Sequence, residues 1–300
     1  MPVVELAGVT KAYETKIAVR SLDLTIEAGQ MFGLLGPNGA GKTSSIRMMM
    51  GITMPDSGTV RLFDRPFDRK SLERVGYLPE ERGLYKKMKV VEQLVFFGAL
   101  HGLEAGEARR RAEAWTKRLE IDEALDKRTE ELSKGMQQKI QFIGALLHDP
   151  GLIVMDEPFS GLDPVNAKLL EKTLLELKDE GKAIVFSTHR MDQVEKLCDS
   201  ICLIDKGMSV LSGRVREIKS RYERNHVEVE FDGKADFLNS AEIAEARNYS
   251  GHAEIRLKPH GDSQKLLREA SSMAQVYRFE LLEPSLEEIF IQTVGGKVDA

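Results

Sequence analysis

Cysteine is almost absent from this chain of 300 residues, which contains only Cys198 and Cys202. Two cysteines in a chain of this length exclude a disulfide framework and indicate a reducing compartment. A metal pair is the weaker interpretation, because no further cysteine or histidine stands beside them. We expect both thiols to be small buried apolar side chains.

Basic residues are not in excess, and long apolar runs are missing. Lys and Arg number 43 against 48 Asp and Glu, a net charge of -5, so no overall positive charge is there to neutralise nucleic-acid phosphates. No apolar run approaches the ~20 residues of a membrane-spanning helix, and Met1–Leu6 lacks a signal-peptide pattern. These absences argue against nucleic acid as the main partner and predict a soluble, cytosolic chain.

The stretch GPNGAGKT, from Gly36 to Thr43, carries the clearest chemistry in the chain. It follows the apolar run Met31–Leu35 and fits the pattern G-x-x-x-x-G-K-[ST] at every fixed position. Glycines let backbone N–H groups curl around phosphate oxygens, and the helix that follows points its positive end at the same anion. Lys42 is expected to reach the β- and γ-phosphates, and the Thr43 hydroxyl to ligate Mg²⁺. A structural turn would not require Lys-Thr, so we interpret the stretch as a P-loop.

Apolar strands alternate with amphipathic helices around this loop. Strands are predicted at residues 3–6, 22–26, 59–63, 75–78, 152–155, 183–186 and 201–204, and helices within 90–148 and at 165–180 and 191–198. The continuous apolar run Leu152–Met155 is typical of a strand buried on both faces of a parallel sheet. The alternation predicts an α/β fold with a mainly parallel sheet.

The pattern of residues changes near Ser220. Val227, Val229 and Phe231 alternate with charged residues, and further short strands and helices follow. The last helix begins with a capping box, Ser285 with Glu288 three positions later.

This mixture indicates a small separate α+β domain. We therefore expect a nucleotide-binding domain over residues 1–219, with a helical subdomain at about 85–150, and the small domain over residues 220–300.

Candidate catalytic groups stand at the ends of two apolar strands. Asp156 would hold the Mg²⁺ shell, and Glu157 would polarise the water that attacks the γ-phosphate. His189 is placed like a sensor of the γ-phosphate, although alone it would be an ordinary loop histidine. Tyr13 precedes the P-loop and is either a platform for a purine or a residue at a sheet edge.

These motifs, in this order, resemble the nucleotide-binding subunit of an ABC transporter from about Val3 to Gly213. Tyr13 matches the adenine-stacking position, GPNGAGKT the Walker A loop and LIVMDEP the Walker B strand. Residues 132–136 occupy the signature position, residues 160–163 match the D-loop, and His189 matches the switch histidine. The resemblance implies an ABC cassette of the P-loop NTPase fold, with a mainly parallel core, an N-terminal antiparallel β subdomain and a helical subdomain.

The resemblance also implies an ATPase with ATP and Mg²⁺ as its ligands, and it implies roles for individual residues. The expected catalytic residues are Lys42, Glu157 and His189. The expected metal-binding residues are Thr43, Glu80 and Asp156. The expected nucleotide-binding residues are Tyr13, Gly36, Pro37, Asn38, Gly39, Ala40, Gly41, Lys42, Thr43, Ser44, Ser133, Lys134, Gly135, Met136 and Asp163.

The chain departs from the family pattern in two places. The signature commonly reads LSGGQ, whereas here Lys134 and Met136 replace Gly and Gln. Ser133, the Gly135 N–H and the helix start can still bind a γ-phosphate. Glu80 stands where the family has a loop glutamine, and a carboxylate there can ligate Mg²⁺ or order water.

The resemblance implies two partners. One is a second ATPase chain, identical or related, that closes head to tail over ATP. The other is a separate permease, which would hold the chain on the inner face of the cell membrane; YLPEERGLY, the signature variant and the carboxy-terminal domain resemble an exporter branch of the family. The alternative is a soluble ABC-type ATPase that acts on ribosomes, DNA or a protein assembly, but this chain has one cassette and no long insertion.

A short segment after Glu80 is a candidate contact for the permease. Leu84, Tyr85, Met88 and Val90 place apolar groups among three lysines, Lys86, Lys87 and Lys89. A permease helix could lie in such a groove, with the lysines facing acidic residues or lipid headgroups. Alternatively, the apolar groups pack under the helical subdomain and the lysines are solvated.

Overall fold

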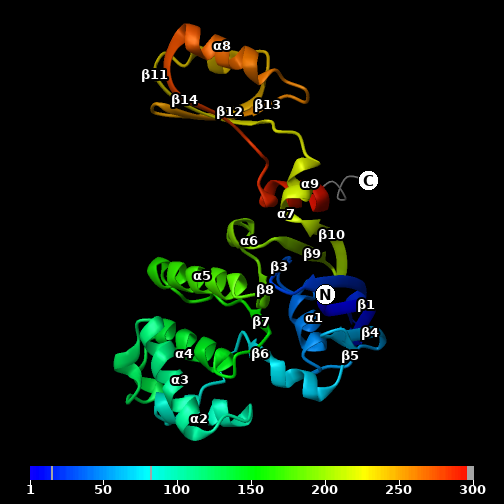
Figure 1. The fold of residues 1–300 in the computed structure, drawn as a ribbon. Helices are drawn as coiled ribbons and strands as arrows, with labels where there is room; N and C mark the ends of the chain where they lie inside the picture. Colours follow the sequence, from blue (N-terminus) through cyan, green and yellow to red (C-terminus); the bar gives the residue numbers. More distant parts are fainter. Residues whose placement is uncertain (15, 82, 296–300) are drawn as a thin grey trace. The chain divides into compact units, whose positions relative to one another are not determined.

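The computed structural model describes residues 1–14, 16–81 and 83–295 (Figure 1). The chain divides into two compact units, Met1–Arg214 and Val215–Ala300, and residues 296–300 of the expected second domain lie outside the described residues. The boundary expected from the sequence, between residues 219 and 220, falls inside helix α7 (Val215–Ser220). Separate clusters of buried apolar side chains lie in the two units.

A six-stranded sheet forms the centre of the first unit. Its strands, in spatial order, are β10 (Met208–Arg214), β9 (Ser200–Asp205), β3 (Met31–Leu35), β8 (Ala183–Thr188), β7 (Leu152–Asp156) and β6 (Val75–Leu78). The pairs from β9 to β6 are parallel, whereas β10 is antiparallel to β9. Parallel strands have their carboxyl ends at one edge, so the segments that follow β3, β6, β7 and β8 gather there.

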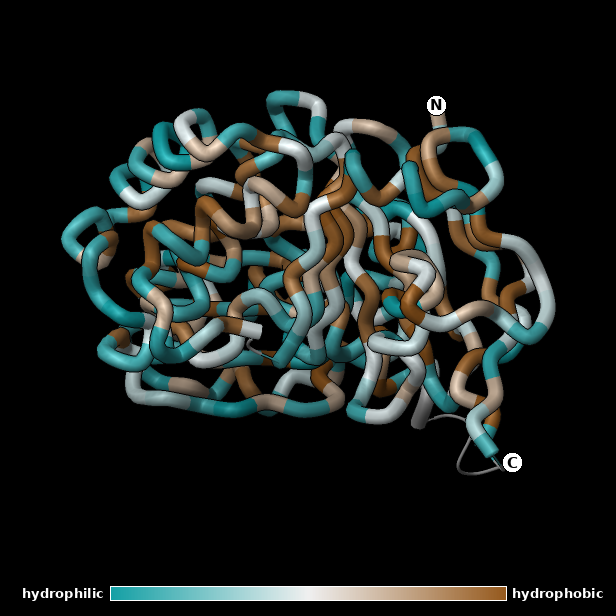
Figure 2. The backbone as a smooth tube through the Cα atoms, turned by 90° about the horizontal axis from the view of Figure 1, so that it is seen from below, coloured by the Kyte–Doolittle hydropathy of each residue, from teal (hydrophilic) through white to brown (hydrophobic). Residues whose placement is uncertain are grey.

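Every residue of β3, β7 and β8 is buried, which agrees with their apolar sequences. The expected α/β fold with a mainly parallel sheet is therefore confirmed. In Figure 2 brown, the colour of hydrophobic residues, is concentrated along the strands in the middle of the picture.

An antiparallel sheet and a set of helices flank this core. The antiparallel sheet has the order β2 (Lys16–Glu27), β1 (Pro2–Tyr13), β4 (Ser57–Leu62) and β5 (Arg65–Pro66). The helices are α1 (Lys42–Met49), α2 (Val90–Leu100), α3 (Ala105–Arg118), α4 (Lys134–Leu146), α5 (Pro164–Asp179) and α6 (Met191–Leu197). In Figure 1 the green helices α2 to α5 lie on one side of the parallel sheet and the blue antiparallel strands on the other. One apolar cluster joins the antiparallel strands, α1 and the parallel strands.

The second unit is an antiparallel sheet with helices. Its strands run in the order β12 (Ile243–Tyr249), β13 (His252–Leu257), β11 (His226–Gly233) and β14 (Ala274–Leu282), and its longer helices are α8 (Ser263–Met273) and α9 (Leu286–Gly295). Alternate residues of β11 are buried in its core, as the sequence pattern predicted. The capping box is confirmed, because the N–H of Ser285 donates to Glu288 Oε2 at 2.9 Å and the N–H of Glu288 donates to Ser285 Oγ at 3.2 Å.

Both cysteines are buried and carry free thiols, as expected. Cys198 directly follows α6, and Cys202 lies in β9. Burial raises the pKa of both thiols. Within the described ranges, no helix is both long enough and apolar enough to cross a bilayer.

Candidate functional site

The loop that follows β3 has a backbone that only glycine can supply. Gly36 and Gly41 adopt φ values of 146° and 117°, a region that side chains disfavour. A Cβ at Gly36 would lie 2.1 Å from the carbonyl oxygen of Ile204, and a Cβ at Gly41 would lie 2.4 Å from that of Ala18. The loop therefore packs its backbone directly against the strands beneath it.

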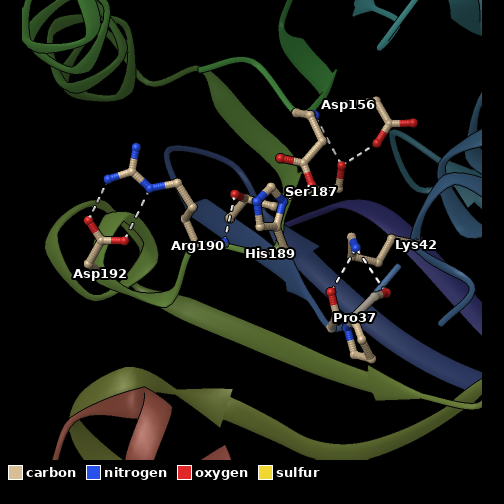
Figure 3. Close-up of polar contacts among 10 residues, drawn as sticks. Pro37, Lys42, Asp156, Ser187, His189, Arg190 and Asp192 are labelled. Carbon is tan, nitrogen blue, oxygen red and sulfur yellow. Dashed lines mark hydrogen bonds and ion pairs between the residues drawn. The ribbon is translucent and has the colours of Figure 1, made fainter. Parts of the chain in front are cut away.

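Lys42 is a buried cation that contacts the loop itself. Its side chain is 6% exposed, and Nζ donates to the carbonyl oxygens of Gly36 at 2.7 Å and Pro37 at 3.2 Å (Figure 3). Burial lowers the pKa of Lys42, whereas the negative charges of Glu157 and Asp156 raise it. Neutral carbonyls compensate a buried ammonium group only in part, so this lysine is ready to take an anionic partner.

The loop opens into a pocket of about 400 Å³. The pocket is lined by Tyr13, Lys16, Ala18, Asn38, Gly39, Gly41, Lys42, Thr43, Ser44, Glu80, Asp156 and Glu157. Four segments that are separate in the sequence thus meet here: the β1–β2 region, the loop with the start of α1, the loop after β6, and the end of β7. Tyr13 is 41% exposed, so its ring is accessible from the pocket.

Two consecutive carboxylates at the end of β7 have different surroundings. Asp156 is 1% exposed and accepts a hydrogen bond from the hydroxyl of Ser187, its neighbour on β8. Glu157 has a φ of 50°, and its N–H donates to both the carbonyl oxygen and the hydroxyl of Ser187 at 3.2 Å. This turn directs the Glu157 side chain away from the buried strand, where Oε1 contacts Nδ1 of His189 at 3.0 Å.

Glu80 lines the same pocket and is placed by a loop that α4 holds. The loop follows β6, and the carbonyl oxygens on both sides of Glu80, those of Pro79 and Glu81, accept hydrogen bonds from Nε2 of Gln141 at 3.2 Å each. Gln141 and Ser187 were not predicted from the sequence. Ser187 stands at the end of an apolar strand, which is a usable signal, whereas no pattern singles out Gln141.

The signature residues do not line this pocket. Ser133 caps α4, accepting the N–H of Met136 at 3.2 Å, and both Ser133 and Lys134 are exposed. Asp163 caps α5, accepting the N–H groups of Val165 and Asn166 at 3.0 Å each, and these bonds, first among them the one from Asn166, lower its pKa. The predicted roles of these residues in nucleotide binding stay predictions.

The sequence matches two families that together cover most of the chain. Residues 19–160 match the family described as ABC transporter, and residues 213–294 match the family described as ATP-binding protein DrrA1-3-like, C-terminal domain.

Two relatives match nearly the whole chain. The uncharacterized ABC transporter ATP-binding protein YhaQ of Bacillus subtilis is 44% identical, covering 96% of this chain and 97% of that protein. The Nod factor export ATP-binding protein I of Cupriavidus pinatubonensis is 36% identical, covering 99% of this chain and 92% of that protein.

A solved structure matches the first unit. That of cbiO1 from Clostridium perfringens, described as part of the ABC transporter complex cbiONQ, has a TM-score of 0.65 and 27% identity over 73% of this chain and 91% of that one.

Proposed function

Because this chain belongs to the ATP-binding subunits of ABC transporters, we propose that it is the motor of an exporter, in which ATP hydrolysis drives a separate membrane permease. The chain is an ATPase of that family. The observation that carries the proposal is one pocket that brings together Lys42, Asp156 and Glu157. We also propose that the first unit is the ATP-binding domain and the second a separate small domain.

We assign the phosphate end of the nucleotide to the loop and α1, and the base to Tyr13. Lys42 would exchange its two carbonyl partners for the β- and γ-phosphate oxygens, a stronger partner for a buried cation. The positive end of α1 points at the same phosphates. A base stacked on the accessible face of Tyr13 would complete the site.

Residues from three segments of the pocket fit a magnesium ion. Thr43, Glu80 and Asp156 line one pocket and offer the oxygen ligands that Mg²⁺ prefers. Ser187 donates to one oxygen of Asp156 and so orients the carboxylate. When bound, Mg²⁺ neutralises charge on the β- and γ-phosphates.

Glu157 is the base that we assign to the attacking water. It is the carboxylate that the backbone turn carries away from the buried strand, beside Asp156 but separate from it. His189 contacts Glu157 and would orient it toward the γ-phosphate.

A second chain would complete the site. Ser133 and the exposed start of α4 lie on the first unit outside its own pocket lining, and a helix N-terminus binds phosphate. Two chains, identical or related, would each add this element to the other's pocket.

A permease would contact the helical region at an exposed aromatic pair. Tyr85 is 53% exposed and Phe96 39%, with ring centroids 5.9 Å apart. The sequence expectation needs a correction here, because Val90 is fully buried and Met88 is partly buried. The direction of transport is proposed from the relatives named for Nod factor export.

The test of ATP binding is Lys42→Ala, with Lys117→Ala as the control, because Lys117 is exposed on α3. Hydrogen bonds to charged groups contribute about 1.5–3 kcal/mol, so Lys42→Ala should weaken ATP binding by roughly 10- to 100-fold. Calorimetry measures the affinity, and thermal melting checks that both variants fold. Wild-type affinity in a folded Lys42→Ala variant would overturn the proposal.

A further inference from the structure

The helix α4 carries side chains that reach both segments bearing the pocket's carboxylates. Gln141 donates to the carbonyl oxygens of Pro79 and Glu81, which flank Glu80. Gln138, one turn earlier, donates to the carbonyl oxygen of Pro158 at 3.1 Å, directly after Glu157. Residues three apart lie on the same helix face, so one face of α4 holds both segments.

Gln141 is placed to hold a loop rather than to fill space. Its side chain is 7% exposed, and both hydrogens of its amide group can be used because two carbonyls accept from the same nitrogen. Its Oε1 has no hydrogen-bond partner within the described part of the chain. A buried acceptor without a partner lowers the stability of the folded protein, and an apolar side chain of the same length would avoid this cost. The donor function of this glutamine therefore distinguishes it from a packing residue.

We propose that Gln141 is a positioning residue that fixes the Glu80 loop against α4 and thereby presents the Glu80 carboxylate to the nucleotide pocket. The role of Glu80 in this inference rests on the proposed function, whereas the position of the loop rests on the hydrogen bonds of Gln141 alone. Because Ser133 caps the same helix, the loop that bears Glu80 is tied to the element that we assign to the second chain's ATP.

The first experiment measures the position of the loop in the nucleotide-free protein. Gln141→Met keeps the length of the side chain and removes both donors, so amide hydrogen exchange at Glu80 and Glu81 should accelerate by at least roughly two- to tenfold, the range for one of the two hydrogen bonds that are lost. The matched control is Gln138→Met, which should accelerate exchange after Glu157 and leave Glu80 and Glu81 at the wild-type rate. Gln141→Asn, which keeps the amide on a shorter side chain, serves if Gln141→Met does not fold.

The second experiment measures what the position does. Glu80→Ala should raise the Mg²⁺ concentration for half-maximal ATP hydrolysis, whereas Glu80→Gln should be mild. Gln141→Met should raise that concentration by roughly two- to tenfold, and the double variant Glu80→Ala with Gln141→Met should match Glu80→Ala alone, because Gln141 acts through Glu80.

The outcomes separate the two claims. Unchanged exchange at Glu80 and Glu81 in Gln141→Met overturns the inference. The inference is also overturned if the effects of Glu80→Ala and Gln141→Met on the Mg²⁺ dependence add up in the double variant. It is overturned as well if Glu80→Ala changes the Mg²⁺ dependence and Gln141→Met does not. If Glu80→Ala leaves the Mg²⁺ dependence unchanged, the metal role proposed for Glu80 fails, and the exchange result still decides whether Gln141 positions the loop.

Discussion

At the scale of single residues, Glu157 has a strained backbone conformation within a hydrogen-bonded turn. A non-glycine residue at a φ of 50° carries roughly 1–3 kcal/mol of strain. Its N–H contacts two oxygen atoms of Ser187, and Ser187 also donates to the buried Asp156. One serine thus holds two neighbouring carboxylates in separate positions, which lets them take different tasks.

The role of Glu157 predicts a specific loss in Glu157→Gln. A glutamine keeps the shape of the side chain but accepts no proton, so hydrolysis should fall by roughly 10²–10⁴-fold, the range for a lost general base. ATP binding should persist, because Lys42 and the loop remain, and the protein should accumulate as an ATP-bound dimer. Phosphate release measures hydrolysis, and light scattering measures the dimer.

The control for this change is Glu113→Gln. Glu113 is exposed on α3, and its carboxylate pairs on the surface with Arg109 at 3.6 Å, so its loss should leave hydrolysis unchanged. Hydrolysis at the wild-type rate in Glu157→Gln would show that another group acts as the base.

Sequence patterns reveal functional residues that belong to one contiguous motif, but they seldom reveal residues that hold a distant segment in place. Lys42 and Thr43 follow from a local motif, because the loop and the helix start are contiguous. Gln141 contacts a loop about 60 positions away, and Ser187 contacts a strand 31 positions away. Such pairs exist only after the sheet has set the order of its strands.

At the scale of elements, the junction of α2 and α4 with β6 contains a stacked histidine pair. The rings of His101 and His148 lie 3.7 Å apart at an interplanar angle of 3°. Nε2 of His148 donates to the carbonyl oxygen of Val75 at 3.1 Å. Burial lowers the pKa of His101, and burial together with the charge of a protonated His101 lowers the pKa of His148 to about 4.

This pair predicts a loss of stability in mild acid. A histidine whose pKa is about 4 when folded and about 6.5 when unfolded binds protons more readily in the unfolded chain, so the free energy of unfolding falls as the pH falls from 6.5 to 4. His148 should contribute a loss of at most about 2 kcal/mol by pH 5, since one pKa unit corresponds to about 1.36 kcal/mol and water partly screens a side chain that is not fully buried. Urea denaturation at pH 7 and pH 5 measures the change.

The variant that isolates this effect is His148→Phe, which keeps an aromatic ring against His101 and cannot be protonated. Its loss of stability between pH 7 and pH 5 should be smaller than that of the wild type. His260→Gln is the control, because His260 is 86% exposed. An equal pH dependence in His148→Phe and the wild type would assign the acid sensitivity to other groups.

The elements that the sequence predicts are those with one strong local signal. Strands β6, β7 and β8 follow from apolar runs, and their observed bounds agree closely with the expected ones. The strands that were missed, β5, β10 and β12, are short or largely exposed. These segments become strands because they pair with a neighbouring strand and not because one of their faces is buried. Such pairing leaves little pattern in their own sequences.

At the scale of the whole molecule, the signature residues and the pocket belong to one unit but do not form one site. The pocket holds the loop and the carboxylates, while Ser133 and Asp163 cap helices outside its lining. Motif order along the chain identifies the parts, but it cannot say which parts meet within one copy.

The last prediction concerns the exposed pair Tyr85 and Phe96, where we propose that the permease docks. An apolar pair whose tyrosine precedes the exposed residues Lys86, Lys87 and Lys89 in the chain fits a partner helix with an apolar face and acidic flanks. Tyr85→Glu with Phe96→Glu places two negative charges in that contact, so the double variant should still fold and bind ATP but no longer co-purify with a membrane protein. Affinity purification from detergent-solubilised membranes measures this association.

Its control uses an exposed pair in the second unit, Tyr277→Glu with Met273→Glu. These side chains are 64% and 49% exposed, so the charges are added to an equally open surface that the docking proposal does not involve. The control variant should retain the membrane protein, because only the helical region carries the contact. Co-purification by both double variants alike would remove Tyr85 and Phe96 from the permease interface. Recovery of the wild-type chain with ribosomes or DNA alone would contradict the exporter assignment itself.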